Sequence, residues 1–412
     1  MKIGIYGGTF DPPHLGHMEA ARTALEQMNL DRLIIIPDCE PPHKDLAEEA
    51  ATPQQRLEMA ALMADGLGPR AEVSDLEIRR EGKSYTADTV EALHETFPED
   101  ELWLLMGTDM FLTVQNWYQP ERIFQYAGVA AFSRSEEDTQ ALFEEQSQYL
   151  AETFHARTTV VNLPKVTEIA SRDLRRMLAS EWTGGNVDPA QYLWTPVYGY
   201  ILREKLFGTQ ADLRHLSDKH LRAISYSMVK AKRLPHIKGT EETAVALAKF
   251  WGVDPEKARR AAILHDCTKY WDLETQVAAC DKYGIALDEL ERVSVKFLHA
   301  KTGAALAKYV FGEPDDVYDA IFCHTTGKPG MTKLDKVLYL ADYMEPSRAF
   351  DGVEELRRLV WEDLDQAMIL GLEMTVEELR ERGAVVHQNT QGTLDDLRRK
   401  LRRTIDPFPR KR

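Results

Sequence analysis

Short apolar runs alternate with amphipathic stretches through the first half of the chain. Several of the runs are continuous and end at a glycine or a proline, which is typical of strands buried in a parallel sheet. The predicted strands are residues 3–6, 33–36, 102–106, 128–132 and 158–163. Residues 17–28 instead have apolar positions at helical spacing. Strands that alternate with helices predict an α/β fold, a doubly wound parallel sheet of the Rossmann-like kind.

The pattern changes after Gly208, where helical spacing takes over and no convincing strand remains. Asp254-Pro255-Glu256 is a typical helix start, with a capping acid, a proline in the first turn and a second acid. Further helices are expected from Pro314 to Gly327 and over residues 333–343. The predicted organisation is an α/β domain over residues 1–208, an all-α domain over residues 213–390 and a basic C-terminal tail over residues 391–412.

The composition is that of an ordinary soluble globular protein, with 43% hydrophobic and 29% charged residues. A formal charge of -16 argues against broad nucleic-acid binding, which needs a positive surface. No apolar stretch is long enough to span a bilayer, and the chain opens on a strand-like run without a basic leader. The cysteines form neither a C-x-x-C pair nor a disulfide framework, which fits a reducing compartment. We therefore expect a cytoplasmic protein.

The stretch GGTFDPPHLGH, residues 7–17, directly follows the first predicted strand. Ligands of parallel sheets bind beyond the carboxyl ends of the strands, and Gly7 and Gly8 would let backbone N–H groups approach a phosphate there. The helix that follows would direct its positive end to the same place. The pattern is neither G-x-G-x-x-G nor G-x-x-x-x-G-K-[ST], so ordinary dinucleotide-binding and P-loop sites are disfavoured.

His14 and His17 flank a leucine and a glycine at the start of this helix. Two imidazoles in that place can donate hydrogen bonds to a phosphoryl group as its charge rearranges, which is electrostatic catalysis without a covalent intermediate. A metal-binding pair is the alternative, but no nearby Cys, Asp or Glu completes an obvious ligand set. A structural capping role would explain one of the histidines more readily than both.

These residues resemble the signature of the nucleotidylyltransferases with the H-x-G-H motif. Further segments follow in order: PPHK at residues 41–44, SYTADTV at 84–90, GTDMF at 107–111, and then Trp117. Together they make residues 1–207 similar to the bacterial nicotinate mononucleotide adenylyltransferases. The resemblance implies transfer of an adenylyl group from ATP to nicotinate mononucleotide, giving deamido-NAD and pyrophosphate, with Mg²⁺ screening the triphosphate.

The same resemblance implies roles for individual residues. His14 and His17 would be catalytic and contact the ATP phosphates, and Lys44 would neutralise the leaving pyrophosphate. The residues expected to bind ATP or its phosphates are Gly7, Gly8, Thr9, Phe10, His14, His17, Lys44, Ser171 and Arg175. The residues expected to bind the nicotinate nucleotide are Tyr85, Thr86, Asp109 and Trp117. Stacking of the Trp117 indole on the pyridine ring is the expected contact, and core packing is the alternative for Tyr85 and Trp117.

One segment departs from the family pattern. The family usually has I-S-S-T-x-x-R near a helix N-terminus, and residues 169–175 read IASRDLR. Ser171 and Arg175 keep their places, whereas Ala170 and Arg172 replace hydroxyl residues. The lost hydroxyls would weaken phosphate binding, and Arg172 would add a cation on the same turn. An exposed helix start explains Arg172 equally well.

The second half has histidines and aspartates beside apolar helical runs. The candidate metal ligands are His236, His265, Asp266, His299, His324 and Asp342. Imidazoles and carboxylates suit divalent transition metals, and two adjacent ligands can both serve because a helix turns them about 100° apart. His236, His265, Asp266 and Asp342 would hold one metal, and His299 and His324 would add a second. Two metals suit hydrolysis of a phosphate ester or anhydride; the alternative is a set of ordinary core histidines.

This set resembles the HD-domain phosphohydrolases. HTTG at residues 324–327 and ADYMEP at residues 341–346 narrow the resemblance, over residues 215–390, to bacterial HD hydrolases that split diadenosine tetraphosphate symmetrically into two ADP. It implies one or two divalent transition metals, iron or manganese, and catalytic roles for Asp266 and Lys269. The residues expected at the polyphosphate are Lys269, Thr325, Thr326 and Arg348. For Arg348, a surface salt bridge is an alternative.

The leading hypothesis is a bifunctional enzyme that uses ATP, nicotinate mononucleotide and diadenosine tetraphosphate, with no nucleic-acid or membrane partner. One alternative gives the first half another acceptor, such as nicotinamide mononucleotide, pantetheine phosphate or a cytidine acceptor. Another makes the HD domain a general nucleotide phosphohydrolase or a nucleotide-binding regulatory module. Whether the chain forms a homo-oligomer is left open.

Overall fold

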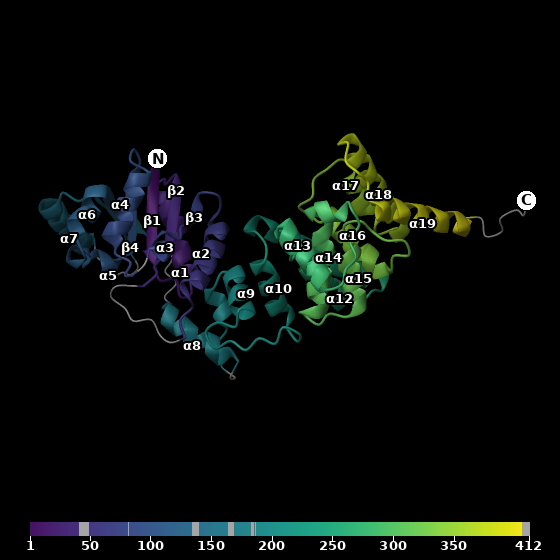
Figure 1. The fold of residues 1–412 in the computed structure, drawn as a ribbon, viewed down its shortest axis with the longest axis horizontal. Helices are drawn as coiled ribbons and strands as arrows, with labels where there is room; N and C mark the ends of the chain where they lie inside the picture. The colour runs from purple at the N-terminus through teal and green to yellow at the C-terminus, as the bar shows by residue number, and fades with distance from the viewer. Residues whose placement is uncertain are drawn as a thin grey trace, which may run out of the picture. The chain divides into compact units, whose positions relative to one another are not determined.

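The computed structural model describes residues 1–40, 49–80, 82–133, 140–163, 169–182, 185 and 187–405, with side chains up to residue 402. The chain divides into two compact units, Met1–Ala211 and Asp212–Arg412 (Figure 1). The first unit contains the sheet, and the described part of the second consists of helices and connecting turns.

A six-stranded parallel sheet forms the centre of the first unit, with the strand order β3-β2-β1-β4-β5-β6. The strands are β1 (Lys2–Gly8), β2 (Arg32–Pro37), β3 (Ala71–Val73), β4 (Glu101–Gly107), β5 (Ala127–Ser133) and β6 (Thr158–Asn162). The predicted Rossmann-like sheet is therefore confirmed. Only β3 was not predicted, because three residues are too few to show a pattern. The order reverses between β1 and β4, which is where such sheets bind ligands.

Helices cover both faces of this sheet (Figure 1). They are α1 (Leu15–Gln27), α2 (Pro53–Leu67), α3 (Leu76–Arg79), α4 (Thr86–Thr96), α5 (Thr108–Phe111), α6 (Pro120–Tyr126), α7 (Gln140–Phe154), α8 (Ser171–Glu181) and α9 (Thr195–Arg203), with 3₁₀ turns η1 (Val114–Asn116) and η2 (Pro189–Tyr192). One core packs α4, α6 and α7 against Ile34 and Ile36 of β2. The other packs α1 and α2 against Leu33 and Ile35. Burial on both sides explains why the apolar run in β2 is continuous.

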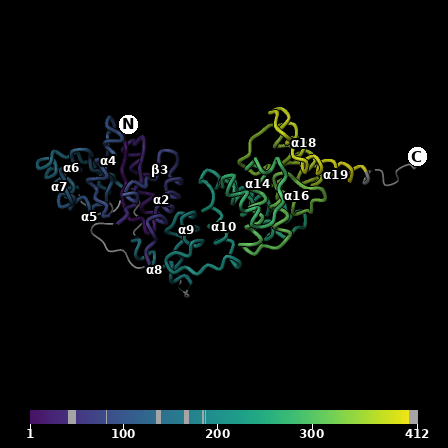
Figure 2. The backbone as a smooth tube through the Cα atoms, in the orientation of Figure 1, coloured from purple at the N-terminus to yellow at the C-terminus, as the bar shows by residue number. Residues whose placement is uncertain are grey.

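The second unit is a helical bundle, as the pattern predicted, and its described residues include no strand. Its elements are α10 (Asp218–Ser227), η3 (Ala231–Arg233), α11 (Leu234–Trp251), α12 (Pro255–Leu264), α13 (Leu273–Lys282), η4 (Glu291–Val293), α14 (Val295–Tyr309), α15 (Asp315–Cys323), α16 (Lys333–Met344), α17 (Val353–Leu359), α18 (Leu364–Glu381) and α19 (Gln388–Ile405). Helices α11, α12, α14, α15 and α16 pack together. Figure 2 labels two of them, α14 and α16, in the green part of the backbone. Most of the segment expected as a basic tail lies in α19. No described helix is long and apolar enough to cross a membrane.

The start of α12 confirms the predicted capping motif. The Asp254 carboxylate accepts hydrogen bonds from the backbone N–H groups of Glu256 and Lys257, and Pro255 occupies the first turn. Proline loses nothing there, because the first N–H groups of a helix have no intrahelical acceptor.

The end of α12 differs from expectation. The helix stops at Leu264, so His265 and Asp266 lie just beyond it rather than within it. The backbone tightens into three-residue turns, in which the N–H of Cys267 donates to the carbonyl of Leu264. Helix α15 was expected to reach Gly327 but likewise ends just before His324. Both histidines thus come from helix ends, where side chains can turn inward.

Candidate functional site

A fully buried arginine on α2 stabilises the loop after β1 through hydrogen bonds. Arg56 Nη1 donates to the Thr9 carbonyl at 3.0 Å and to Asp38 Oδ1 at 2.8 Å, and Nη2 donates to the Cys39 carbonyl at 3.0 Å. Thr9 Oγ1 donates to Asp38 Oδ2 at 2.9 Å. The ends of β1 and β2 are therefore joined by one network. A lone arginine inside a helix gives no sequence signal of this role.

The rings of His14 and His17 lie close together at the start of α1, tilted by 38° to each other. Their ring centroids are 3.8 Å apart, and the backbone N–H of His14 donates to His17 Nδ1 at 3.2 Å. Because Nδ1 of His17 accepts, a neutral ring carries its proton on Nε2. Phe10 packs edge-on against His17 from a left-handed backbone conformation, φ 49°. The local fold thus fixes the tautomer that a hydrogen-bond donor toward phosphate needs.

Residues 169–175, which depart from the family pattern, contact the same loop after β1. Ser171 Oγ donates to the Pro12 carbonyl at 3.1 Å, and Arg175 Nη1 donates to the Asp11 carbonyl at 2.6 Å. The Arg175 guanidinium also pairs with the Asp11 carboxylate at 3.3 Å. Arg172 is exposed and pairs with its neighbour Asp173 at 3.5 Å. In this structure the retained residues brace the loop from α8, and Arg172 fits an exposed helix start.

A cavity of about 230 Å³ opens where the sheet order reverses. Six residues expected at the substrates line it: Gly7, Gly8, Thr9, Tyr85, Thr86 and Trp117. Tyr118 and Glu77 also line it and were not predicted; the Tyr118 ring lies 4.4 Å from that of Tyr85, centroid to centroid. An aromatic wall beside a glycine turn suits a flat ring that carries a phosphate.

Glu77 is an unexpected acid in this wall. It is buried, and its Oε1 accepts from Thr89 Oγ1 at 2.6 Å. Burial raises the pKa of its carboxyl, and the hydrogen bonds from Thr89 and Ser84 oppose that shift.

The other described residues that were expected at the substrates of the first unit do not line this cavity. Phe10, His14 and His17 are on the adjoining loop and helix but not among the lining residues. Asp109 is exposed on α5 and does not line the cavity. Lys44 lies outside the described residues.

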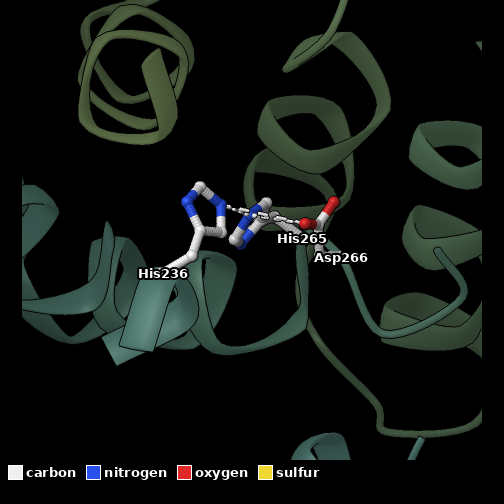
Figure 3. A group of neighbouring side chains, drawn as sticks. All are labelled: His236, His265 and Asp266. Atoms are coloured by element: carbon white, nitrogen blue, oxygen red, sulfur yellow. Dashed lines mark hydrogen bonds and ion pairs between the residues drawn. The ribbon is translucent and has the colours of Figure 1, made fainter. Parts of the chain in front are cut away.

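In the second unit, the histidines and aspartates expected as ligands converge from five helices. Figure 3 shows His236, on α11, turned toward His265 and Asp266. The Nε2 atoms of His236 and His265 are 3.3 Å apart, and Asp266 Oδ2 is 3.5 Å from His265 Nε2. Asp342, on α16, brings Oδ1 to 2.9 Å from His236 Nε2. Together these atoms form one donor group.

Asp266 also faces a second group. Its other oxygen, Oδ1, lies 3.3 Å from His299 Nε2 and 3.8 Å from His324 Nε2. The ligand atoms of these three residues lie within 4.8 Å of one another, as do those of Asp266 with His236 and His265. One carboxylate thus stands between two imidazole pairs, which is the arrangement expected for a bridging ligand.

Three of the rings are oriented by acceptors behind them. His265 Nδ1 lies 2.6 Å from the Ala262 carbonyl and His324 Nδ1 lies 2.7 Å from the Ile321 carbonyl. His236 Nδ1 lies 3.0 Å from Glu345 Oε1. These acceptors place the ring proton on Nδ1 and leave the Nε2 lone pair facing inward, as in metal-binding histidines.

The donor chemistry fits a divalent metal. His236 Nε2 and Asp342 Oδ1 are both acceptors in that tautomer and lie 2.9 Å apart, so a bound cation would relieve the repulsion between them. Asp266 Oδ1 and His324 Nε2 are buried and form no hydrogen bond within the described part of the chain. Buried acceptors without a hydrogen bond are rare unless they coordinate a ligand. The residues present therefore fit a metal at each group.

Burial sets the protonation of these ligands. It lowers the pKa of His265 to about 3 and that of His299 to about 4, so both rings are neutral at physiological pH. For Asp266, burial would raise the pKa, but the surrounding side chains, the Lys269 ammonium among them, outweigh it and hold the pKa well below its usual range. Neutral imidazoles around an ionised carboxylate are the forms that bind metals.

The expected polyphosphate residues surround this centre. Lys269 Nζ lies 3.1 Å from His299 Nε2 and 3.4 Å from Asp266 Oδ1. Thr325 Oγ1 is buried without a hydrogen-bond partner among the residues described, whereas Thr326 Oγ1 donates to the Gly327 carbonyl. The Arg348 side chain is 35% exposed and pairs with Asp342, with Nη2 3.1 Å from Oδ1.

Two residues at this centre were not predicted. Arg233 contacts Asp266 Oδ2 through Nε at 2.6 Å and Nη2 at 2.5 Å. Glu345 is fully buried behind His236, where it also accepts from the backbone N–H and hydroxyl of Ser347. Arg233 lies three residues before the candidate ligand His236, and Glu345 lies three residues after the candidate ligand Asp342. This spacing, about one helical turn, was the sequence signal that could have pointed to them.

A third cluster, Asp288, Glu291 and His387, also brings ligand atoms together. Here Lys301 Nζ lies 2.6 Å from Glu291 Oε1, and His387 Nδ1 accepts from the N–H of Asn389. An ammonium group already neutralises the carboxylate, so this cluster is an ion-pair network that ties the start of α19 to η4.

Comparison with known proteins follows the division of the chain. Residues 5–177 match the model of the cytidylyltransferase-like family, and residues 233–347 match that of the HD domain. A "probable nicotinate-nucleotide adenylyltransferase" from Carboxydothermus hydrogenoformans is 35% identical over 206 residues, which are 50% of this chain and 98% of that protein. The chain belongs to the cytidylyltransferase-like family in its first half. Its second half is an HD domain.

Relatives of the HD domain are similar over the second unit. A "symmetrical bis(5'-nucleosyl)-tetraphosphatase" from Halalkalibacterium halodurans is 37% identical over 166 residues, 40% of this chain and 88% of that protein. The crystal structure of a "predicted HD superfamily hydrolase involved in NAD metabolism" from Clostridium acetobutylicum is 35% identical, with a TM-score of 0.44 over 45% of this chain and 98% of that one. The two relatives named by their activities are thus each matched over most of their own length by one half of this chain.

Proposed function

We propose that the cytidylyltransferase-like unit transfers the adenylyl group of ATP to the phosphate of nicotinate mononucleotide, giving deamido-NAD and pyrophosphate. The observation that carries the proposal is the cavity at the reversal of the sheet order, where the glycine turn meets Tyr85, Thr86 and Trp117. The name of the Carboxydothermus relative supports this choice of acceptor.

The residues of the chain divide the work of this transfer. Gly7 and Gly8 leave backbone N–H groups accessible to phosphate, and in the described part of the chain, apart from the two neighbouring residues, no atom lies within 4 Å of the place where a Gly7 Cβ would stand. His17, with its proton on Nε2, stabilises charge as the bond to pyrophosphate breaks. Trp117 and Tyr85 orient the pyridine ring. Mg²⁺ bound with ATP would neutralise the triphosphate.

Product analysis on the intact chain tests this function. ATP is supplied with nicotinate mononucleotide, nicotinamide mononucleotide or pantetheine phosphate, and dinucleotide and pyrophosphate are measured. The proposal expects deamido-NAD as the preferred product. Faster turnover of either other acceptor would replace it with the corresponding alternative transferase.

We propose that the HD unit is a metal-dependent hydrolase that splits diadenosine tetraphosphate into two ADP. The observation that carries this proposal is the bridging position of Asp266 between two imidazole pairs. Manganese or iron would be held by His236, His265, Asp266 and Asp342 on one side and by Asp266, His299 and His324 on the other. Bound metals supply Lewis-acid polarisation of the phosphoryl oxygens and an activated water.

The groups around this centre then bind the anionic substrate. Lys269, beside His299, and Arg348, beside Asp342, bring positive charge to the polyphosphate chain. The buried hydroxyl of Thr325 is placed to donate to a phosphoryl oxygen. A symmetric cut requires the central phosphates to lie over Asp266, with an adenosine on either side.

Metal analysis and hydrolysis assays test this second function. The purified chain should carry a transition metal. The His265→Ala variant should carry no metal and should no longer release ADP from diadenosine tetraphosphate. A chain that binds nucleotides but cannot be reconstituted with manganese or iron would instead be a regulatory module. Faster hydrolysis of ordinary nucleotides would make it a general nucleotide phosphohydrolase.

A further inference from the structure

Arg233 lies at the HD centre, in contact with Asp266, and was not among the residues expected there from the sequence. It is the last residue of η3, directly before α11, and its side chain is 19% exposed. Nε and Nη2 both approach Asp266 Oδ2, at 2.6 and 2.5 Å. The same oxygen lies 3.5 Å from His265 Nε2 and 3.8 Å from His236 Nε2. The guanidinium therefore shares one oxygen with the donor group that fits a metal.

Arg348 repeats this arrangement on the other carboxylate. Its Nη2 contacts Asp342 Oδ1, the oxygen that lies 2.9 Å from His236 Nε2. Lys269 approaches Asp266 from the opposite side, at Oδ1. Positive side chains thus stand on both oxygens of Asp266 and on the inward oxygen of Asp342.

A guanidinium on a ligand oxygen opposes a divalent cation on that oxygen, because like charges repel strongly at such distances. If Arg233 served only to hold Asp266 in place, a neutral hydrogen-bond donor would do so without this repulsion. The planar fork of arginine instead matches the oxygens of phosphate, which a lysine cannot contact in the same paired manner. An anionic substrate removes the repulsion by adding negative charge beside the metal.

We infer that Arg233 is a substrate-binding residue of the HD centre. When the polyphosphate binds, the guanidinium gives up its contact with Asp266 Oδ2 and contacts a phosphate group instead. This inference rests on the proposed hydrolase function. Arg233 and Lys269 then contact phosphates on the two sides of Asp266, as a chain lying across the bridging carboxylate requires.

The test separates metal binding from phosphate binding. The full-length Arg233→Gln variant is stripped with a chelator, and its Mn²⁺ affinity is measured by chelator competition without nucleotide. Inorganic tripolyphosphate is then titrated calorimetrically at saturating Mn²⁺. The expected results are Mn²⁺ affinity equal to or above that of the wild type, and tripolyphosphate affinity about tenfold lower, the effect of losing one charge-assisted contact.

Two further variants control this comparison. Lys232→Gln removes the same charge from the neighbouring exposed side chain and should leave both affinities unchanged. Arg233→Lys keeps the charge but loses the fork, so its tripolyphosphate affinity should fall between those of the wild type and Arg233→Gln. It also provides a folded protein for the titrations if Arg233→Gln unfolds, which circular dichroism would reveal.

Loss of Mn²⁺ affinity, or unchanged tripolyphosphate binding at saturating Mn²⁺, would overturn the inference and make Arg233 a positioning residue for Asp266. Failure of the proposed function has a different signature. If the wild-type chain binds tripolyphosphate through Arg233 but releases no ADP from diadenosine tetraphosphate, Arg233 is still a phosphate-binding residue. In that case diadenosine tetraphosphate is not the substrate.

Discussion

At the scale of single residues, the metal-fitting centre depends on atoms behind the ligands as much as on the ligands. Glu345 is fully buried and fixes the His236 ring through Nδ1. Gly239 makes room for it, since a Cβ at that position would lie 2.5 Å from Glu345 Oε2. The chain thus reserves space on α11 for a carboxylate from the turn after α16.

Glu345→Gln should lower the Mn²⁺ affinity of the HD unit by about 10- to 100-fold, the usual effect of losing a partner behind a metal-binding histidine. The amide can present its NH₂ group to Nδ1, which would favour the wrong tautomer. Chelator competition measures the change. The exposed Glu355→Gln is the control, and equal affinities for the two variants would contradict the orienting role.

In the first unit, Trp117→Ala should raise the KM for nicotinate mononucleotide about tenfold or more with little change in the KM for ATP, because stacking on an aromatic ring contributes about 1–3 kcal/mol. Steady-state kinetics with each substrate varied checks the split. Trp361→Ala, at an exposed tryptophan of the second unit, is the matched control. A parallel rise in both KM values would mean that Trp117 supports the fold instead.

At the scale of elements, the ends of strands and helices carry the chemistry. Arg56 joins α2 to the ends of β1 and β2 through bonds to two carbonyls and the Asp38 carboxylate. Arg56→Met should destabilise the first unit by about 3 kcal/mol, since it leaves the part-buried Asp38 carboxylate and two carbonyls without their donor. Denaturant unfolding measures it. The exposed Arg22→Met on α1 should change stability little, and a similar loss there would refute the specific role of Arg56.

The buried histidines of the second unit predict acid sensitivity. An unfolded histidine titrates near pH 6.5, whereas burial lowers the pKa of His265 to about 3 and that of His299 to about 4. Between these values the unfolded chain binds more protons, so stability is retained above pH 6.5 and lost as pH falls toward 4. Each ring contributes up to about 1.4 kcal/mol per pH unit.

Urea unfolding of the chelator-treated protein at several pH values measures this slope. His299→Gln should make the slope shallower, whereas His215→Gln, at a side chain that is 81% exposed, should leave it unchanged. Stability that is flat from pH 7 to pH 4.5 would contradict the burial of neutral rings.

The sequence pattern predicted elements better than it predicted their ends. Continuous apolar runs revealed the central strands because burial on both faces leaves no alternation to misread. The edge strand β3 is too short for a pattern, and the stops of α12 and α15 depend on side chains that turn inward only after the bundle has assembled. Local spacing could propose His265 and His324 as ligands but could not reveal the carbonyls that orient them.

Residues that act through long-range contacts were the ones missed. Arg56, Arg233 and Glu345 each meet partners far away in sequence or on a different element, so no short motif contains the interaction. Glu77 is similar, because its burial in the cavity wall depends on how α3 packs beside α4.

At the scale of the whole molecule, the chain is two units with separate cores and separate candidate sites. The two units should each fold when they are produced separately. Residues 1–211 should retain the transfer activity of the intact chain, and residues 212–412 should retain its metal content. Circular dichroism and turnover measurements on the two pieces check this. Equal rates in fused and separated forms would exclude direct channelling, and collapse of either piece would show that the units depend on each other.

The division at Ala211 and Asp212 also has a consequence for gene dosage. Because one messenger RNA encodes both units, every translated copy delivers the two catalytic centres in a one-to-one ratio. Transcriptional control cannot raise one output without the other. Under the proposed functions, independent adjustment would come from what differs between the centres after synthesis, namely metal supply for the helical unit and nucleotide levels for both.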